Sequence, residues 1–114
     1  MKFHRFEEIL AWQKAKELCV MVYRIFGESR DFGFRDQIQR ASVSVMNNIA
    51  EGFERKSNNE FRHFLYIAKG SCGELRSMLI LAKELKKLPE PEASGLLQHA
   101  EEVSKMLAGL IKTL

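Results

Sequence analysis

The spacing of apolar residues constrains this chain more than any other feature of its sequence. Apolar side chains recur every three or four residues along the long segments, and no stretch of useful length alternates apolar and polar residues. The first pattern places apolar side chains on one face of an α-helix, whereas alternation would indicate a β-strand. The sequence therefore predicts an all-α fold.

Turn and capping signals divide the chain into four helical segments. The predicted helices cover residues 6–28, 34–55, 57–88 and 92–114. Ser57 is a predicted N-cap, with Glu60 three residues later completing a capping box. Pro89 and Pro91 separate the last two segments, since proline cannot continue the hydrogen bonding of a helix interior. Short connections between four helices predict an antiparallel up-down-up-down four-helix bundle.

Length and composition support a single domain and argue against several classes of protein. The 114 residues suffice for one domain, residues 1–114. The proportions of hydrophobic residues, 46%, and charged residues, 29%, are those of a water-soluble globular protein. No apolar run approaches the roughly 18 residues that span a bilayer. The first eight residues carry acids, Glu7 and Glu8, where a signal peptide needs an apolar stretch, so we expect a cytoplasmic protein with no membrane partner.

The second predicted helix is apolar around most of its circumference. One face, which would point into the core, consists of Phe34, Ile38, Ala41, Val45 and Ile49. A second face, about 100° further round the helix, consists of Val43, Met46, Ala50 and Phe53. One interpretation is a deeply buried helix with some exposed apolar surface. We favour the other, in which the second face contacts another copy of the chain, because exposed apolar patches usually mark interfaces. The pattern therefore predicts a homo-oligomer.

Polar residues on the remaining strip of this helix allow two hypotheses. Arg40, Asn48 and Glu51 lie on or beside the strip, and Glu74 is a further candidate on the third helix. Asparagine lowers helix propensity unless its side chain is hydrogen-bonded. One hypothesis is a ligand or catalytic cleft. The hypothesis we favour is a structural polar network of these four residues that fixes the register of the helices.

Cations recur every seven residues along the third predicted helix. They are Arg62, Lys69, Arg76 and Lys83, and Lys86 and Lys87 extend the row. Residues 57–88 hold six basic and three acidic groups, a net charge of +3, whereas residues 89–114 are acidic. Cations about 10 Å apart on one stripe can follow a nucleic-acid backbone and bind RNA or DNA in a salt-dependent way. The alternative is that these long side chains cover the edge of the core.

The sequence lacks the residue constellations that carry catalysis or bind a metal ion or cofactor. Glu60 and His63 form one Glu-x-x-His motif, whereas a di-iron bundle needs two. Cys19 and Cys72 lie within apolar helices and are predicted core thiols. We therefore expect a non-enzymatic protein with no metal ion and no cofactor.

Glycine is unfavourable inside a helix, and three of the glycines within the predicted helices stand out. Gly52, Gly70 and Gly73 match no phosphate-binding loop. Because each costs about 1 kcal/mol relative to alanine, we predict that they permit the close approach of a neighbouring helix.

Four motifs resemble a known family over nearly the whole chain. They are FEEILAWQKA at residues 6–15, QIQRASVSV at 37–45, NIAEG at 48–52 and GSCGEL at 70–75. In this order they resemble the bacterial four-helix bundle proteins related to the ribosomal RNA intervening-sequence protein, some of which are encoded inside insertions in the large-subunit ribosomal RNA gene. Gln39 departs from the family pattern, in which a second basic residue is usual at that position.

The resemblance implies a homopentamer and no active site. A distant relative, the accessory variability protein of diversity-generating retroelements, binds a reverse transcriptase and nucleic acid. Two hypotheses of function follow. The chain is an oligomer that binds RNA or DNA through its basic helix, or it is a scaffold that docks a protein partner such as a reverse transcriptase.

Overall fold

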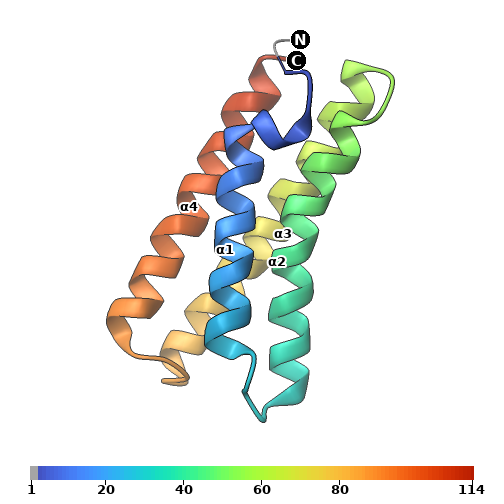
Figure 1. The fold of residues 1–114 in the computed structure, drawn as a ribbon. Coiled ribbons are helices and arrows are strands. Elements are labelled where there is room, and N and C mark those ends of the chain that lie inside the picture. The colour runs from blue at the N-terminus through green and yellow to red at the C-terminus, as the bar shows by residue number, and fades with distance from the viewer. Residues whose placement is uncertain (1–2) are drawn as a thin grey trace.

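The chain folds into four long helices that run alternately in opposite directions (Figure 1). The computed structural model describes residues 3–114. A short 3-10 turn, η1 (Phe6–Glu8), precedes α1 (Leu10–Phe26), α2 (Phe32–Phe53), α3 (Asn58–Glu84) and α4 (Glu90–Lys112). The C-terminal end of α4 lies at the same end of the bundle as η1 (Figure 1).

Each helix packs against two neighbours. Helices α1 and α3 both contact α2 and α4, while the part of the chain that the structure describes shows no close approach between α1 and α3 or between α2 and α4. This is the arrangement of helices in sequence order around a square, as in an up-down-up-down bundle. The predicted fold is therefore confirmed.

Side chains that cap free backbone groups fix where α2 and α3 begin. Ser57 Oγ accepts a hydrogen bond from the backbone N–H of Glu60 at 3.2 Å, so the predicted N-cap is confirmed. The Asp31 carboxylate accepts a hydrogen bond from the backbone N–H of Phe34 at 3.3 Å and caps α2. Because of this second cap, α2 begins at Phe32, two residues earlier than predicted.

Helix α3 ends at Glu84, four residues earlier than predicted. The backbone N–H of Lys87 bonds to the carbonyl of Ala82 at 2.9 Å, and the N–H of Lys86 bonds to the carbonyl of Lys83 at 3.1 Å. Lys86 adopts a left-handed φ of 55°. Together these features form a Schellman C-cap, a position that glycine usually occupies.

Both prolines of the following connection belong to the start of α4. Pro89 is the cap residue and Pro91 lies in the first turn. Proline is tolerated there because the first N–H groups of a helix have no intrahelical acceptor. Helix α4 therefore begins at Glu90 rather than at residue 92. Helix α1 likewise begins at Leu10, because residues 6–8 form the separate turn η1.

The core runs along the axis of the bundle and receives side chains from all four helices. Its largest fully buried side chains are Phe26, Phe61, Ile9, Leu18, Ile38, Ile49, Leu65, Leu75, Leu79, Leu107, Val22 and Val45. Within residues 3–114, no helix combines the length and the hydropathy needed to cross a lipid bilayer.

Candidate functional site

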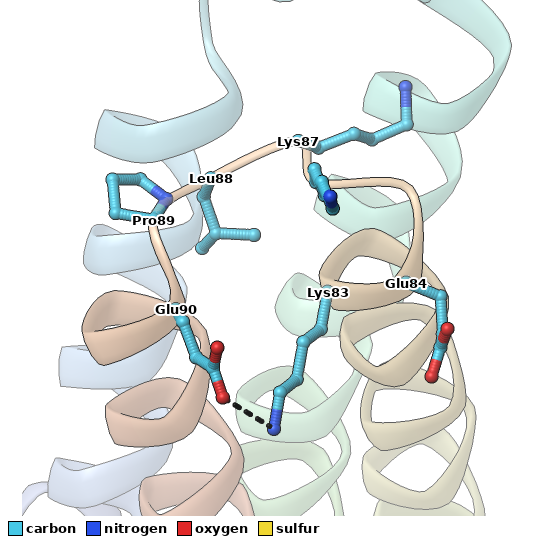
Figure 2. A pocket seen from close by; sticks show the side chains of 7 residues that line it. Lys83, Glu84, Lys87, Leu88, Pro89 and Glu90 are labelled. Atoms are coloured by element: carbon cyan, nitrogen blue, oxygen red, sulfur yellow. Dashed lines mark ion pairs between the residues drawn. The ribbon is translucent and has the colours of Figure 1, made fainter.

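The four predicted nucleic-acid contacts lie along the edge of α3 that faces α4. Arg76 Nη2 lies 4.0 Å from Glu101 Oε1, and Lys83 Nζ lies 3.7 Å from Glu90 Oε1. Figure 2 shows Lys83 and Glu90 pointing toward one another across the connection between the two helices. Exposed pairs of this kind add little stability. These two pairs nevertheless place one carboxylate of α4 beside each of two cations, Arg76 and Lys83.

The other two cations of this row, Arg62 and Lys69, differ from Arg76 and Lys83 in their surroundings. Arg62 Nη1 donates to Asn59 Oδ1 at 2.8 Å. Among the residues that the structure describes, neither Arg62 nor Lys69 has a carboxylate within 4.0 Å. In residues 3–114, two of the four cations thus lie near a carboxylate of α4 and two do not, and their contact with a nucleic acid stays a prediction.

Residues at the connection between α3 and α4 line an open hollow, and the side chain of Lys87 points away from it (Figure 2). The hollow has a volume of about 650 Å³ and is lined by residues 83, 84 and 86–90. Lys87 Nζ lies 2.8 Å from Asp31 Oδ2 and 4.9 Å from the centroid of the Phe34 ring. The hydrogen bond from Lys87, together with that from the Phe34 N–H, holds the pKa of the Asp31 carboxyl below its ordinary value. Lys87 thus ties together the two connections at this end of the bundle.

The polar network predicted between the helices forms around Asn48. Asn48 Nδ2 donates to the backbone carbonyl of Ser44 at 2.8 Å and to Ser44 Oγ at 3.0 Å. Ser44 Oγ in turn lies 2.9 Å from Ser71 Oγ on α3. The sequence prediction omits both serines. Both serines have small hydroxyl side chains and lie on the facing edges of two adjacent helices, and this pattern could have predicted their contact.

Arg40, Glu51 and Glu74 do not join this network, and the prediction is wrong for them. All three residues are exposed. Glu51 pairs with Arg55 on its own helix at 2.8 Å. Arg40 and Glu74 line a shallow hollow of about 180 Å³ between α2 and α3, yet within residues 3–114 neither belongs to an ion pair. The physical reason is that small hydroxyl groups fill the seam between the helices and leave the longer side chains in solvent.

The second apolar face of α2 is half-buried within the chain. Met46 and Phe53 pack against the core, and the Phe53 ring meets the Phe61 ring edge-on with 5.9 Å between centroids. Val43 and Ala50 are also half-buried. The bundle itself thus covers part of this face, with Phe61 of α3 lying against Phe53. A role for Val43, Met46, Ala50 and Phe53 in a subunit contact stays a prediction.

Exposed apolar side chains gather on α3 instead. Of the ten large apolar side chains that are exposed in residues 3–114, five belong to α3 or its C-cap. Three of them and two glycines lie within about 100° of arc on one side of the helix. We call this set the α3 outer face; it consists of Tyr66 (57% exposed), Gly70, Gly73, Ile80 (51%) and Leu81 (47%). A Cβ atom at either glycine would meet nothing within 4 Å. Within the chain, the predicted close helix approach is therefore wrong for Gly70 and Gly73.

Comparison with known proteins places the chain in a family. Residues 7–109 match the family model described as 23S rRNA-intervening sequence protein. The chain belongs to this family. It is also similar to a crystal structure of a protein with unknown function from the S23 ribosomal protein family of Bacteroides thetaiotaomicron, with a TM-score of 0.84, 24% sequence identity, and coverage of 90% of this chain and 99% of that chain. At this identity the likeness shows the shared fold alone. A comparison with curated proteins finds no match.

In this member of the 23S rRNA-intervening sequence protein family, the NIAEG motif ends at a close contact between α2 and α3. A Cβ atom at Gly52 would lie 2.6 Å from Phe64 Cβ and 3.1 Å from Phe61 Cδ1. Real side chains do not approach so closely, so only glycine fits without a shift of the helices. The predicted role of Gly52 is confirmed.

The two cysteines of this family member are buried in the core, as predicted. Cys72 Sγ lies 3.2 Å from the backbone carbonyl of Ala100, and Ser42 Oγ donates to Cys19 Sγ at 3.4 Å. Burial raises the pKa of the Cys72 thiol to about 11. The thiol is therefore protonated at neutral pH and makes a poor nucleophile.

The single Glu-x-x-His motif lies on the surface. Glu60 and His63 are both exposed near the start of α3. In the described residues 3–114, no three His, Cys, Asp or Glu side chains come together in a way that could hold a metal ion. His99 is half-buried, with its Nε2 atom 3.1 Å from the backbone carbonyl of Lys14, which is a contact between α4 and α1.

Proposed function

We propose that this protein is a non-catalytic helical subunit that acts through self-association. The observation that carries the proposal is the α3 outer face. Monomeric proteins seldom expose large apolar side chains side by side, and such patches usually mark an interface. Five copies is the number that the family resemblance implies.

The proposal assigns no chemical step to the bundle. The two thiols of the chain, those of Cys19 and Cys72, are buried in the core. Arg40 and Glu74 share a shallow hollow with Gln37 and Ser44, and no nucleophile with a neighbouring base accompanies them there. Binding and assembly are the activities that this arrangement of side chains supports.

Light scattering coupled to size-exclusion chromatography tests self-association. One chain has a mass of 13.2 kDa, so five copies would give five times that mass, about 66 kDa. We expect an oligomer at micromolar concentration that persists on dilution. A mass of 13.2 kDa across the whole concentration range would contradict the proposal.

A second candidate function is the binding of RNA or DNA by the assembled protein. It is supported by Arg62 and Lys69, which have no carboxylate within 4.0 Å in residues 3–114. Symmetry would repeat these two cations in every subunit. Against it stand Glu101 and Glu90, whose carboxylates lie within 4.0 Å of Arg76 and Lys83 and would repel a phosphate there.

A salt titration distinguishes this candidate from simple assembly. Each phosphate neutralised contributes a slope of about 0.9 in a plot of log affinity against log salt concentration. We expect the variant with Arg62→Gln and Lys69→Gln to bind a labelled RNA or DNA more weakly and with a smaller slope than the wild type. The matched control changes the paired cations, Arg76→Gln and Lys83→Gln, and should have the smaller effect. If neither variant weakens binding or lowers the slope, the result would argue against binding at this edge. Docking of a protein partner such as a reverse transcriptase stays a prediction.

A further inference from the structure

We infer that the α3 helices of successive copies pack parallel to one another around a common axis, with the α3 outer face in the contact. This inference rests on the proposed self-association and names the surface that carries it. It replaces the second face of α2, which the bundle itself half-covers, as the principal contact between copies.

The first support is the shape of the α3 outer face. Gly70 and Gly73 lower helix stability relative to alanine, and within residues 3–114 no neighbouring atom occupies the space that their missing side chains leave. Gly52 shows the contrast, because there the missing side chain is what lets Phe64 approach. The two glycines of α3 form a low strip between the exposed side chains of Tyr66 and Ile80, where a second helix can approach the backbone closely.

The second support is the charge on the two edges of the face. The edge toward α4 carries Lys69, and the edge toward α2 carries Glu74, which lines the hollow beside Arg40. In the described part of the chain, neither Lys69 nor Glu74 belongs to an ion pair. A face with a cation on one edge and a carboxylate on the other is complementary to a copy of itself.

This charge pattern also fixes the relative direction of the helices. Rotation about an axis parallel to α3 places the Lys69 edge of one copy beside the Glu74 edge of the next. Lys69 and Glu74 are five residues apart, so they are offset by about 7.5 Å along the helix axis. The lysine and glutamate side chains together are long enough to span this offset. An antiparallel pairing would instead set the basic edge against its own copy, where like charges repel. The exposed apolar side chains of Tyr66, Ile80 and Leu81 offer a phosphate backbone no partner, so a second copy of the chain is the better fit.

Substitutions on the face test the inference in the full chain by light scattering and sedimentation. We expect Gly70→Ala with Gly73→Ala, and separately Ile80→Ser with Leu81→Ser, to weaken association at least tenfold while circular dichroism stays helical. The alanine pair is informative because it favours the helix of an isolated chain, so a loss of assembly cannot come from unfolding. The matched control is Val20→Ser on α1, which is 40% exposed outside the face and should leave the mass unchanged.

Charge reversal tests the parallel arrangement. Lys69→Glu and Glu74→Lys should each weaken association, and the double variant, in which every contact again joins opposite charges, should restore it. The inference is overturned if the wild type is an oligomer and its mass is unchanged by every α3 substitution. It is also overturned if only Val43→Asp, on α2, dissociates the oligomer. In either case the proposed self-association would still hold. A monomeric wild type would overturn both.

Discussion

Replacing Gly52 with alanine tests the contact that sets the distance between α2 and α3. The added Cβ would lie 2.6 Å from Phe64 Cβ and 3.1 Å from Phe61 Cδ1, whereas carbon atoms pack best at about 3.5–4.0 Å. Phe64 Cβ is bonded to the backbone, so no change of rotamer removes the closer contact. The two helices must move apart by roughly 1 Å, the gap between the two distances.

The expected result is a loss of stability. Overpacking of a close contact costs about 1–3 kcal/mol, and the better helix propensity of alanine returns about 1 kcal/mol. The contact involves a Cβ atom that is bonded to the backbone, so we place the cost of overpacking at the upper end of this range. We therefore expect the free energy of unfolding to fall by about 2 kcal/mol. Urea unfolding followed by circular dichroism, at one protein concentration for all variants, measures it.

The control is Gly95→Ala on α4, where a Cβ would meet nothing within 4 Å. That variant should gain up to about 1 kcal/mol from helix propensity alone, so the two substitutions are expected to have opposite signs. A Gly52→Ala variant as stable as the wild type would show that α2 and α3 do not approach as closely as the structure has them.

Three further predictions concern the loops and the core. Lys86→Gly should raise the free energy of unfolding by about 0.5–1 kcal/mol, since glycine adopts a φ of 55° without the clash that a Cβ atom causes; an unchanged urea midpoint would contradict this. Because the hydrogen bond from Lys87 lowers the pKa of Asp31 in the folded state, its contribution is complete above the ordinary carboxyl pKa and is lost as the pH falls through the acid range. Asp31→Asn should therefore be less stable than wild type at pH 7, and this difference should shrink toward pH 3 in thermal melts. With a pKa of about 11 and full burial, Cys72 should react with a thiol reagent only as fast as the protein unfolds, and rapid labelling of the native protein at pH 8 would argue against the packing of the core.

The sequence by itself determines the fold class and the order of the helices. Apolar spacing, the Ser57 cap and the two prolines are local signals, and each acts through backbone geometry or a hydrogen bond a few residues away. The end of α3 escapes this kind of prediction, because Lys86 takes a left-handed conformation that its side chain does not favour. The cap at Asp31 was available in the sequence, since aspartate ahead of a helical segment is a common N-cap.

The surfaces of the bundle were decided only by the tertiary structure. Periodicity shows which residues share a face of one helix, but not which faces a neighbouring helix covers. Phe53 is half-buried because Phe61 of α3 lies against it, and Arg76 has a carboxylate 4.0 Å away because Glu101 of α4 lies opposite. Gly52 and Gly73 look alike in sequence, yet one meets Phe64 and the other meets open space. Such differences depend on distances between segments far apart in the chain, and those distances exist only once the helices have packed.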